Sequence, residues 1–456
     1  MKNQKETKIG KKYNVTRSIL SVSIYKTLLI AGFCCVVLFA IFGFSSQGGN
    51  TDTPTKAAKV WVPQDPPNSP IGEAKGIFPG RVVWIRDASV STWNSEFGEG
   101  HWWDDKFTNQ GKVDTMMEKD LLTLTGSTTA SDAWNKIFTY YNKTHEKGDK
   151  GYQKGQTIAV KINCNNAYEG YGDVDNQIDA SKQTVLALLR QLVNKAGVDQ
   201  KDILVYEAIR VIPDHIYNPC HKEFPEVQWM DSKGNTENGR LPVQWRPNTI
   251  TYSGPTKCGT SIPQLVYDAT YLINMALVKG HPSVGVSLTA KNHYGTVNAQ
   301  DHPWFKPGDY HPFVDFIGSK NLGGKTIIYI LDGLFGIRDV NDPVTREYAG
   351  WKNLFNNEWL SSIFMSQDPL AIDAVGYDFL RSEFGERLGR STGAAADVYM
   401  HEAALANNPP SGTIYKPDGV QLKSLGVHEH WNNADKKQYT RNLDPNGKGV
   451  ELIKVQ

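Results

Sequence analysis

Short apolar runs alternate with segments of helical periodicity along most of the chain. In 181–196, Val185, Leu188, Leu189, Leu192 and Val193 recur at helical spacing before Gly197. The runs expected to form strands are 80–86, 157–163, 203–206, 271–277, 284–289, 326–331 and 361–365. The other expected helices are 113–124, 133–141 (with Ser131 as N-cap), 311–317, 369–384 and 394–406. This alternation predicts an α/β protein with a largely parallel sheet flanked by helices. Two long loop-rich insertions, 211–260 and 407–456, are expected to decorate the sheet.

The first 75 residues differ in composition from the rest. A basic leader (1–27) precedes an apolar segment (28–46) and a linker rich in Gly, Pro and Thr (47–75), so we expect the α/β domain over 76–456. The 17 uncharged residues 28–44 approach the minimum length of a membrane-spanning helix. Cations on the N-terminal side predict an uncleaved signal anchor, with the body outside the cytoplasm, periplasmic or extracellular. The alternative is a signal peptide cleaved near 45–48.

Charge and cysteine content exclude some classes of protein. Residues 1–26 carry seven Lys or Arg and one Glu, which leaves 42 basic and 47 acidic residues in the body. A body with a net charge of −5 and no basic patch is not expected to bind nucleic acid. The five cysteines include no CxxC pair, so an iron–sulfur cluster or a zinc ribbon is not expected.

The stretch 269–298 concentrates chemically active side chains. Lys279 and His281 follow one predicted strand, and Lys291 and His293 follow the next. Residues i and i+2 of a strand share a face, so each Lys/His pair is expected to point into one space. In open parallel sheets, ligands bind outside the carboxyl ends of the strands. This stretch is therefore the centre of the predicted site.

The other strand ends are also polar. The ends of single strands are often polar because loops are, but the whole set predicts one pocket. Its further members are Lys161, Asn163, Glu207, Arg210, Asn292, Asp332, Ser366, Asp368 and Asp373.

Three kinds of chemistry fit this set, and the sequence does not choose between them. Lys161, Asn163, Asn292 and Ser366 suit an anionic carboxylate or phosphate ligand. Asp332, Asp368 and Asp373, together with the histidines, suit a divalent metal ion. Lysines among other cations have lowered pKa values and serve as bases or nucleophiles, so we assign catalytic roles to Lys279, Lys291, His281 and His293.

Other motifs are weaker. His401–Glu402 lacks the second histidine of a zincin helix, and His428 and His430 share a face if the chain is extended there but are expected at the surface. No GxSxG or GxGxxG motif occurs, which removes the main support for an α/β-hydrolase or a dinucleotide-binding protein.

Four segments resemble the DUF362 family, which has no established activity. They are IAVKINCN (158–165), INMALVKGHPSVGVSLTAKNHYGTV (273–297), IIYILDGLFG (327–336) and FMSQDPLAIDAVGYDFL (364–380). The chain is similar to an exported subgroup and lacks the ferredoxin-like cysteine cluster of some members. The resemblance implies an α/β fold. It also implicates nine of the polar positions named above: Lys161, Asn163, Lys279, His281, Lys291, Asn292, Asp332, Asp368 and Asp373. It implies no substrate.

We therefore expect a membrane-anchored, extracytoplasmic enzyme that acts on an anionic small molecule or a glycan at a Lys/His/Asp pocket. A non-catalytic envelope protein that binds an anionic ligand, and a structural envelope protein, are the alternatives. A divalent metal remains a candidate cofactor.

Overall fold

The computed structural model describes residues 65–168, 170–172, 175–254, 259–302, 310–391 and 396–456. The predicted leader and membrane segment, and most of the predicted linker, lie outside these residues. Among the helices in these ranges, none combines the length and apolar character needed to cross a membrane.

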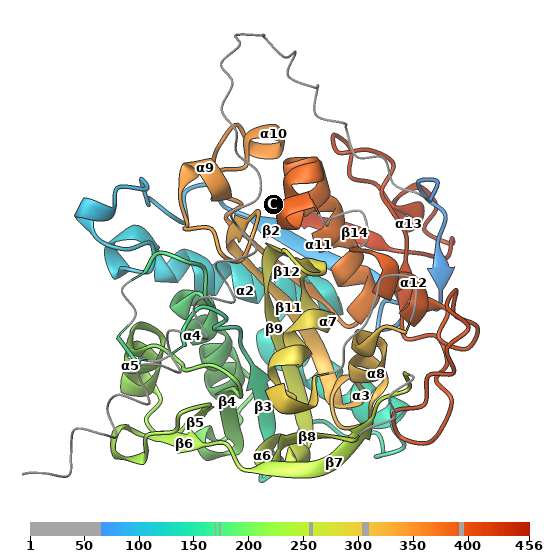
Figure 1. The fold of residues 1–456 in the computed structure, drawn as a ribbon, viewed down its shortest axis with the longest axis horizontal. Coiled ribbons are helices and arrows are strands. Elements are labelled where there is room, and N and C mark those ends of the chain that lie inside the picture. The colour runs from blue at the N-terminus through green and yellow to red at the C-terminus, as the bar shows by residue number, and fades with distance from the viewer. Residues whose placement is uncertain (1–64, 169, 173–174, 255–258, 303–309, 392–395) are drawn as a thin grey trace, which may run out of the picture. The chain divides into compact units, whose positions relative to one another are not determined.

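A large mixed sheet forms the centre of the described chain (Figure 1). Its strand order is β14-β2-β12-β11-β9-β3-β4-β5-β6, and β10 pairs with β9. Most neighbours are parallel, but β12 runs antiparallel to both β11 and β2, and β10 runs antiparallel to β9. The bounds are β2 Arg81–Arg86, β3 Ile158–Lys161, β4 Ile203–Glu207, β5 Gln228–Asp231, β6 Arg240–Pro242, β9 Tyr271–His281, β10 Gly285–Ser287, β11 Thr326–Ile337, β12 Ser362–Ser366 and β14 Glu451–Val455. The predicted α/β class with a largely parallel sheet is confirmed.

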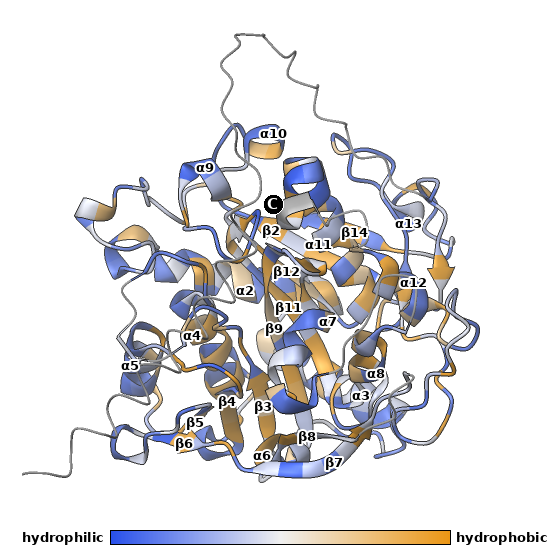
Figure 2. Cartoon of the chain, viewed as in Figure 1, coloured by the Kyte–Doolittle hydropathy of each residue, from blue (hydrophilic) through white to orange (hydrophobic). Residues whose placement is uncertain are grey.

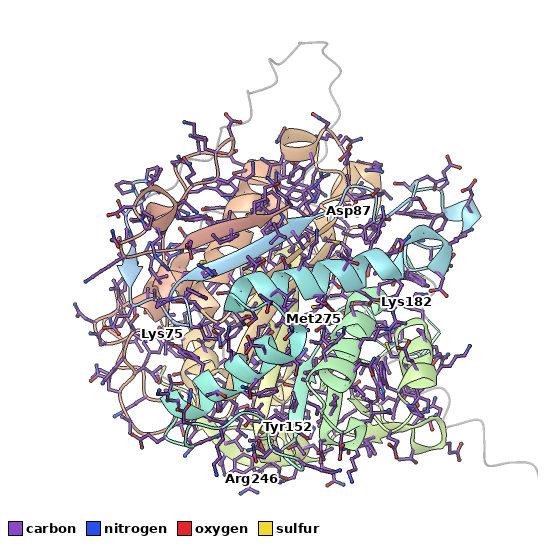
Figure 3. All side chains as sticks on the ribbon, turned by 180° about the vertical axis from the view of Figure 1, so that it is seen from behind. Lys75, Asp87, Tyr152, Lys182, Arg246 and Met275 are labelled. Atoms are coloured by element: carbon purple, nitrogen blue, oxygen red, sulfur yellow. The ribbon has the colours of Figure 1, made fainter. Side chains whose placement is uncertain are left out.

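Helices cover both faces of this sheet because its strands are apolar on both sides (Figure 2). Along β9, Tyr271, Ile273 and Met275 pack on one face, and Leu272 and Ala276 on the other. Figure 3 shows the first face covered by helices from the N-terminal half of the described chain. They are α2 Gln110–Thr125, α3 Ala130–Thr144, α4 Lys182–Arg190 and α5 Asp214–Glu223. The other face packs against α7 Thr289–Asn292, α8 Pro312–Gly318, α11 Pro369–Phe384 and α12 Val398–Ala404.

The segments predicted as loop-rich insertions contain more regular structure than expected. Residues 211–260 include α5, β5, β6 and most of a hairpin, and the C-terminal segment ends in β14, which pairs with β2 at the sheet edge. The smaller elements are β1 Ile71–Gly72, β7 Trp245–Thr251, β8 Gly259–Pro263, β13 Val427–His428, α6 Gln264–Asp268, α9 Arg346–Ala349, α10 Lys352–Phe355 and α13 Thr440–Leu443. β1 pairs with β13, and β7 with β8.

Helix ends follow local capping rules with one correction. Thr129, two residues before the expected Ser131, caps α3 by accepting a hydrogen bond from the Asp132 N–H. Helix α11 has the bounds that its pattern predicts, because Asp368 caps its first turn and Pro369 occupies its first position.

Candidate functional site

A pocket of about 490 Å³ opens at the carboxyl ends of β3, β4 and β9. Its polar lining includes Asn163, Glu207, Arg210, His281, Lys291 and His302. These side chains come from three strand ends and from the segment that contains α7. The expected strand-end pocket therefore exists, with a different membership.

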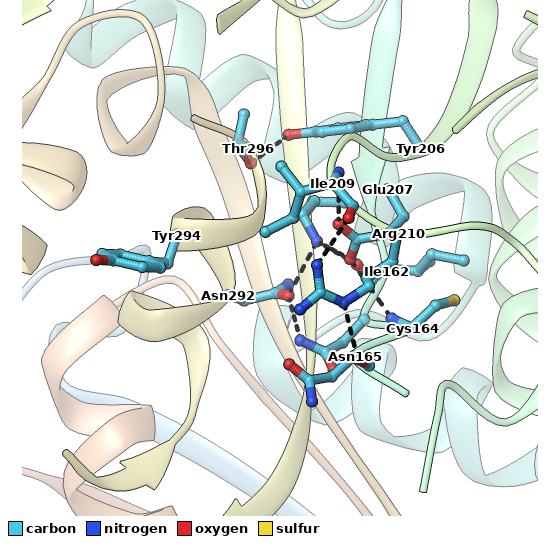
Figure 4. A network of polar contacts seen from close by, with 12 residues as sticks. Ile162, Cys164, Asn165, Tyr206, Glu207, Ile209, Arg210, Asn292, Tyr294 and Thr296 are labelled. Atoms are coloured by element: carbon cyan, nitrogen blue, oxygen red, sulfur yellow. Dashed lines mark hydrogen bonds and ion pairs between the residues drawn. The ribbon is translucent and has the colours of Figure 1, made fainter. Parts of the chain in front are cut away.

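A buried ion pair forms the floor of this region. Lys161 at the end of β3 donates from Nζ to Glu207 Oε2 at 2.7 Å and to Asn292 Oδ1 at 3.3 Å (Figure 4). Both side chains of the pair are almost fully buried, at 0% and 3% exposure. The Glu207 carboxylate also accepts hydrogen bonds from the Cys164 and Ile209 N–H groups, so its negative charge is compensated by donors within the protein. Glu207 thus neutralises Lys161 and leaves little negative charge for the other cations.

Two asparagines, Asn292 and Asn163, connect this ion pair to a second lysine, and a third, Asn274, holds Asn292. Asn163 accepts from Lys279 Nζ at 2.7 Å and donates to Asn292 Oδ1 at 3.0 Å. Asn292 in turn donates to Asn274 Oδ1 at 2.8 Å. Because each amide is held on both sides, the network fixes the predicted residues Lys161, Asn163, Lys279 and Asn292 relative to one another.

Gly295 allows the chain after α7 to approach this ion pair closely. A Cβ atom at this position would lie 3.0 Å from Glu207 Oε1 and 3.1 Å from Lys161 Nζ. Only a residue without a side chain fits there without displacement of the pair.

Lys291 lies in α7 and lines the pocket. Burial, together with the positive charges of Lys279, Arg210 and Lys161, lowers the pKa of Lys291 to about 7. Burial also lowers the pKa of Lys279, to about 8, against the opposing effect of Asp179 and Glu207. Among the described residues, no carboxylate forms an ion pair with Lys291. In a substantial fraction of the molecules, Lys291 is therefore an uncharged amine at neutral pH.

The pocket histidines are uncharged at neutral pH. Burial, followed by the charges of Lys291 and Lys279, lowers the pKa of His281 to about 2. Burial and Lys291 lower the pKa of His302 to about 4, and His302 Nε2 lies 3.0 Å from the Tyr294 carbonyl oxygen. The positive charge of the pocket therefore comes from lysine and arginine.

His293 does not share the pocket with Lys291, which corrects the expectation for this pair. The predicted strand 284–289 is β10 Gly285–Ser287 followed at once by α7 and a 3-10 turn, His293–Gly295. Successive helical residues are rotated by about 100°, so positions i and i+2 point in nearly opposite directions. His293 is fully buried and does not line the pocket.

Ser366 and Asp368 lie at the opposite end of the strands from the pocket. The register pairs Ser366 with Tyr329, near the start of β11, and Ser362 with Gly333. Because β12 is antiparallel to β11, its carboxyl end lies opposite the pocket. Ser366 donates to the Arg81 carbonyl oxygen, and Asp368 caps α11 and accepts from the Lys75 and Val427 N–H groups.

The predicted metal-binding aspartates are separate acceptors of hydrogen bonds. Asp332 accepts from Ser181 N–H at 2.8 Å. Asp373 accepts from Thr289 N–H at 2.8 Å and Ala290 N–H at 3.0 Å, the first two residues of α7. Together with Asp368, these carboxylates hold elements in place and do not converge; the one group of converging metal-ligand side chains among the described residues is Asp65, Asp397, His401 and His428.

Several pocket residues had a weak signal or none in the sequence. Arg210 and Glu207 followed a predicted strand, but nothing singled them out from other polar strand ends. Tyr168, Tyr294 and His302 also line the pocket, and they lie in loops or short turns without a motif. The proximity of these side chains is a product of the tertiary fold.

Comparisons with known proteins add a partial match. Residues 244–378 match the family model described as "Domain of unknown function (DUF362)". No curated protein sequence matches the chain. Among solved structures, the lactate racemase apoprotein from Thermoanaerobacterium thermosaccharolyticum is 11% identical, with 56% of this chain covered and a TM-score of 0.32. The chain spans 52% of that structure's length.

Proposed function

We propose a function from the pocket itself, because the family model that matches residues 244–378 is described only as a domain of unknown function. In this proposal the protein is an enzyme that binds an anionic small molecule, with Lys291 as its base. The observation that carries this proposal is that Arg210 and Lys291 both line the pocket without a carboxylate partner among the described residues. Among the lining residues that the structure describes, the only carboxylate is that of Glu207, which pairs with Lys161.

Arg210 is held in position to receive the anionic group. Its Nε donates to the Asn165 carbonyl oxygen at 3.0 Å, and its Nη1 to the Ile209 carbonyl oxygen at 2.8 Å. Carbonyl oxygens orient the guanidinium without neutralising it. A carboxylate or phosphate accepts well from such a planar donor, and the amides of Asn163 and Asn165 lie in the same lining.

Lys291 supplies the reactive group. A base works best when its pKa is near the working pH, and Lys291 meets this condition because burial and neighbouring cations disfavour its charge. Its Nζ lies over the Tyr294 ring, 4.3 Å from the centroid, a contact that places the side chain without an ion pair and attracts its protonated form. We assign the uncharged amine the role of proton acceptor from the bound molecule.

Turnover of a panel of small carboxylates, sugar acids and phosphate esters tests this proposal. We expect Lys291→Met to abolish turnover while retaining the fold, and Lys279→Met to reduce it. The exposed Lys416→Met is the matched control and should leave turnover unchanged. Saturable binding without turnover in the natural protein would replace the enzyme by a binding protein, and turnover by Lys291→Met would remove Lys291 as the base.

We also propose that this activity takes place outside the cytoplasm at the cell membrane. The support is the uncharged segment 28–44 with its preceding cations. Protease added to cells whose outer envelope has been opened, with the cell membrane left intact, should digest the body but not the leader. A body that stays protected in such cells would place the pocket in the cytoplasm.

A further inference from the structure

A second group of polar side chains lies where the N-terminal end of the described chain meets α12 and β13. Asp65, Asp397, His401 and His428 each offer one ligand-type atom, and these atoms all lie within 4.8 Å of one another. None of the four lines the pocket. Asp397 and His401 belong to the start of α12, which Figure 1 labels, and β1 and β13 pack against this helix. The sequence predicted neither the grouping nor the burial of His428.

We propose that these four residues bind one divalent transition-metal ion, outside the pocket and independently of the proposed reaction. Two imidazole nitrogens and two carboxylate oxygens form the mixed ligand set that zinc and its neighbours prefer, and hard cations such as Ca²⁺ prefer oxygen alone. The two carboxylates also balance the charge of a divalent ion.

His428 gives the strongest evidence for a ligand. Its side chain is 1% exposed, and neither ring nitrogen has a hydrogen-bond partner within the part of the chain that the structure describes. A buried imidazole without a partner is costly, because at least one nitrogen gives up its hydrogen bonds to water. A metal ion at the convergence point would satisfy this nitrogen.

His401 has the orientation of a supported metal ligand. Its Nδ1 lies 3.1 Å from the Asp397 carbonyl oxygen, so this nitrogen donates and Nε2 faces the cluster. Backbone support of one ring nitrogen is typical of histidines that bind metal through the other. Nε2 closely approaches Asp65 Oδ2, and in a neutral ring this contact joins two acceptors unless a cation lies between them.

The surrounding contacts hold the group in place. The His401 and His428 rings lie 4.7 Å apart between centroids, and the His428 and His430 rings 4.9 Å apart. His430 Nδ1 lies 2.7 Å from Asp378 Oδ1, and Asp378 also accepts from Tyr439. No lysine or arginine in the described ranges forms an ion pair with Asp65 or Asp397.

A bound metal ion would also tether residues 65–71, the segment that leads into β1. Asp65 precedes β1, and Ile71 of β1 pairs with His428 of β13. A metal bound to both Asp65 and His428 would fasten residues 65–71 to the body. Asp65 keeps 40% of its side chain exposed, so the ion has a route from solvent.

Zinc uptake by the purified full-length protein after chelator treatment tests the site. We expect one equivalent of Zn²⁺ to be retained, with affinity at least tenfold weaker in Asp65→Asn and His428→Gln. His101→Gln, a partly exposed histidine outside the group, is the matched control and should bind as the natural protein does. Because Asp65 is partly exposed, Asp65→Asn remains informative if His428→Gln does not fold.

Two further measurements distinguish a specific metal site from adventitious binding of the metal ion. Co²⁺ should give visible absorption bands that disappear in Asp65→Asn, and Zn²⁺ should protect residues 65–71 from limited proteolysis. Equal uptake by Asp65→Asn and the natural protein, displacement of Zn²⁺ by Ca²⁺, or no uptake at all would overturn the proposal.

Discussion

The ammonium of Lys161 illustrates how single residues define the pocket. It is fully buried and reaches Glu207, Asn292 and the Ile162 carbonyl oxygen, so its charge and all its donors are satisfied inside the protein. Lys291 belongs to the same predicted set of lysines, but, unlike Lys161, it has no carboxylate partner among the described residues. The sequence could identify both lysines, but only the fold assigns one to structure and the other to the pocket.

Removal of Lys161 should destabilise the fold strongly. Lys161→Met leaves Glu207 buried without its partner, and breaking a buried ion pair costs about 3–5 kcal/mol. The exposed pair Lys154–Asp199 is the control, and Lys154→Met should leave the free energy of unfolding almost unchanged, because solvent screens this pair. Urea unfolding measures both. Equal effects of the two substitutions would show that the buried pair does not support the fold.

A methyl group at Gly295 should disturb the same pair. Gly295→Ala places a Cβ 3.0 Å from Glu207 Oε1, and overpacking of this kind costs about 1–3 kcal/mol. The matched substitution Gly98→Ala has no atom within 4 Å of its Cβ and should change stability by less than about 0.5 kcal/mol. Thermal unfolding of the two variants distinguishes them, and an unperturbed Gly295→Ala would contradict the close approach.

At the scale of elements, the sequence predicts the existence of strands and helices better than their directions. The run 361–365 is a strand, as expected, but it is antiparallel to β11. This direction places Ser366 and Asp368 at the opposite end of the strands from the pocket. Strand direction depends on how the connection from β11 returns, which an apolar pattern does not encode. Likewise, the run 284–289 is too short to distinguish a strand from a strand followed by a helix.

Asp373 should influence ligand binding through α7. It accepts hydrogen bonds from the first two N–H groups of the helix that carries Lys291. Asp373→Ala should cost about 1–3 kcal/mol of stability, because buried donors lose their acceptor, and should also weaken binding of an anion in the pocket. Asp368→Ala removes a comparable N-cap from α11, which starts at the opposite end of the strands from the pocket. This substitution should destabilise the protein but leave anion binding in the pocket intact. Equal loss of binding in both variants would remove the positioning role of Asp373.

At the scale of the whole molecule, the pocket and the proposed metal site combine residues that are distant in the chain. Residue 65 meets residue 428 through β1 and β13, and β3, β4 and β9 bring the pocket residues together. A pattern along the chain can indicate which residues are chemically capable, but it does not indicate which of them meet. The sequence therefore predicted the α/β fold correctly and named the lysines as candidates, but it did not indicate the His401–His428 group.

The lowered pKa of Lys291 predicts how global stability changes with pH. Between about 7, its pKa in the folded protein, and 10.5, its ordinary value, the unfolded chain binds a proton that the folded protein does not. Stability should therefore rise with pH across this window, by up to about 1.4 kcal/mol per pH unit from this residue. Lys291→Met should show a shallower rise in urea unfolding at successive pH values. An identical pH dependence in both proteins would show that Lys291 keeps its ordinary pKa.

We propose that Arg210 and Lys291 together form a receptor for an anionic small molecule. The most direct measurement is calorimetric titration of the natural protein, Arg210→Gln, Lys291→Met and the control Lys416→Met with the carboxylate, sugar-acid and phosphate panel. We expect saturable binding of at least one anion, weakened at least tenfold in Arg210→Gln and in Lys291→Met and unchanged in the control. Binding that is equally tight in all four proteins, or no binding of any anion by the natural protein, would contradict it.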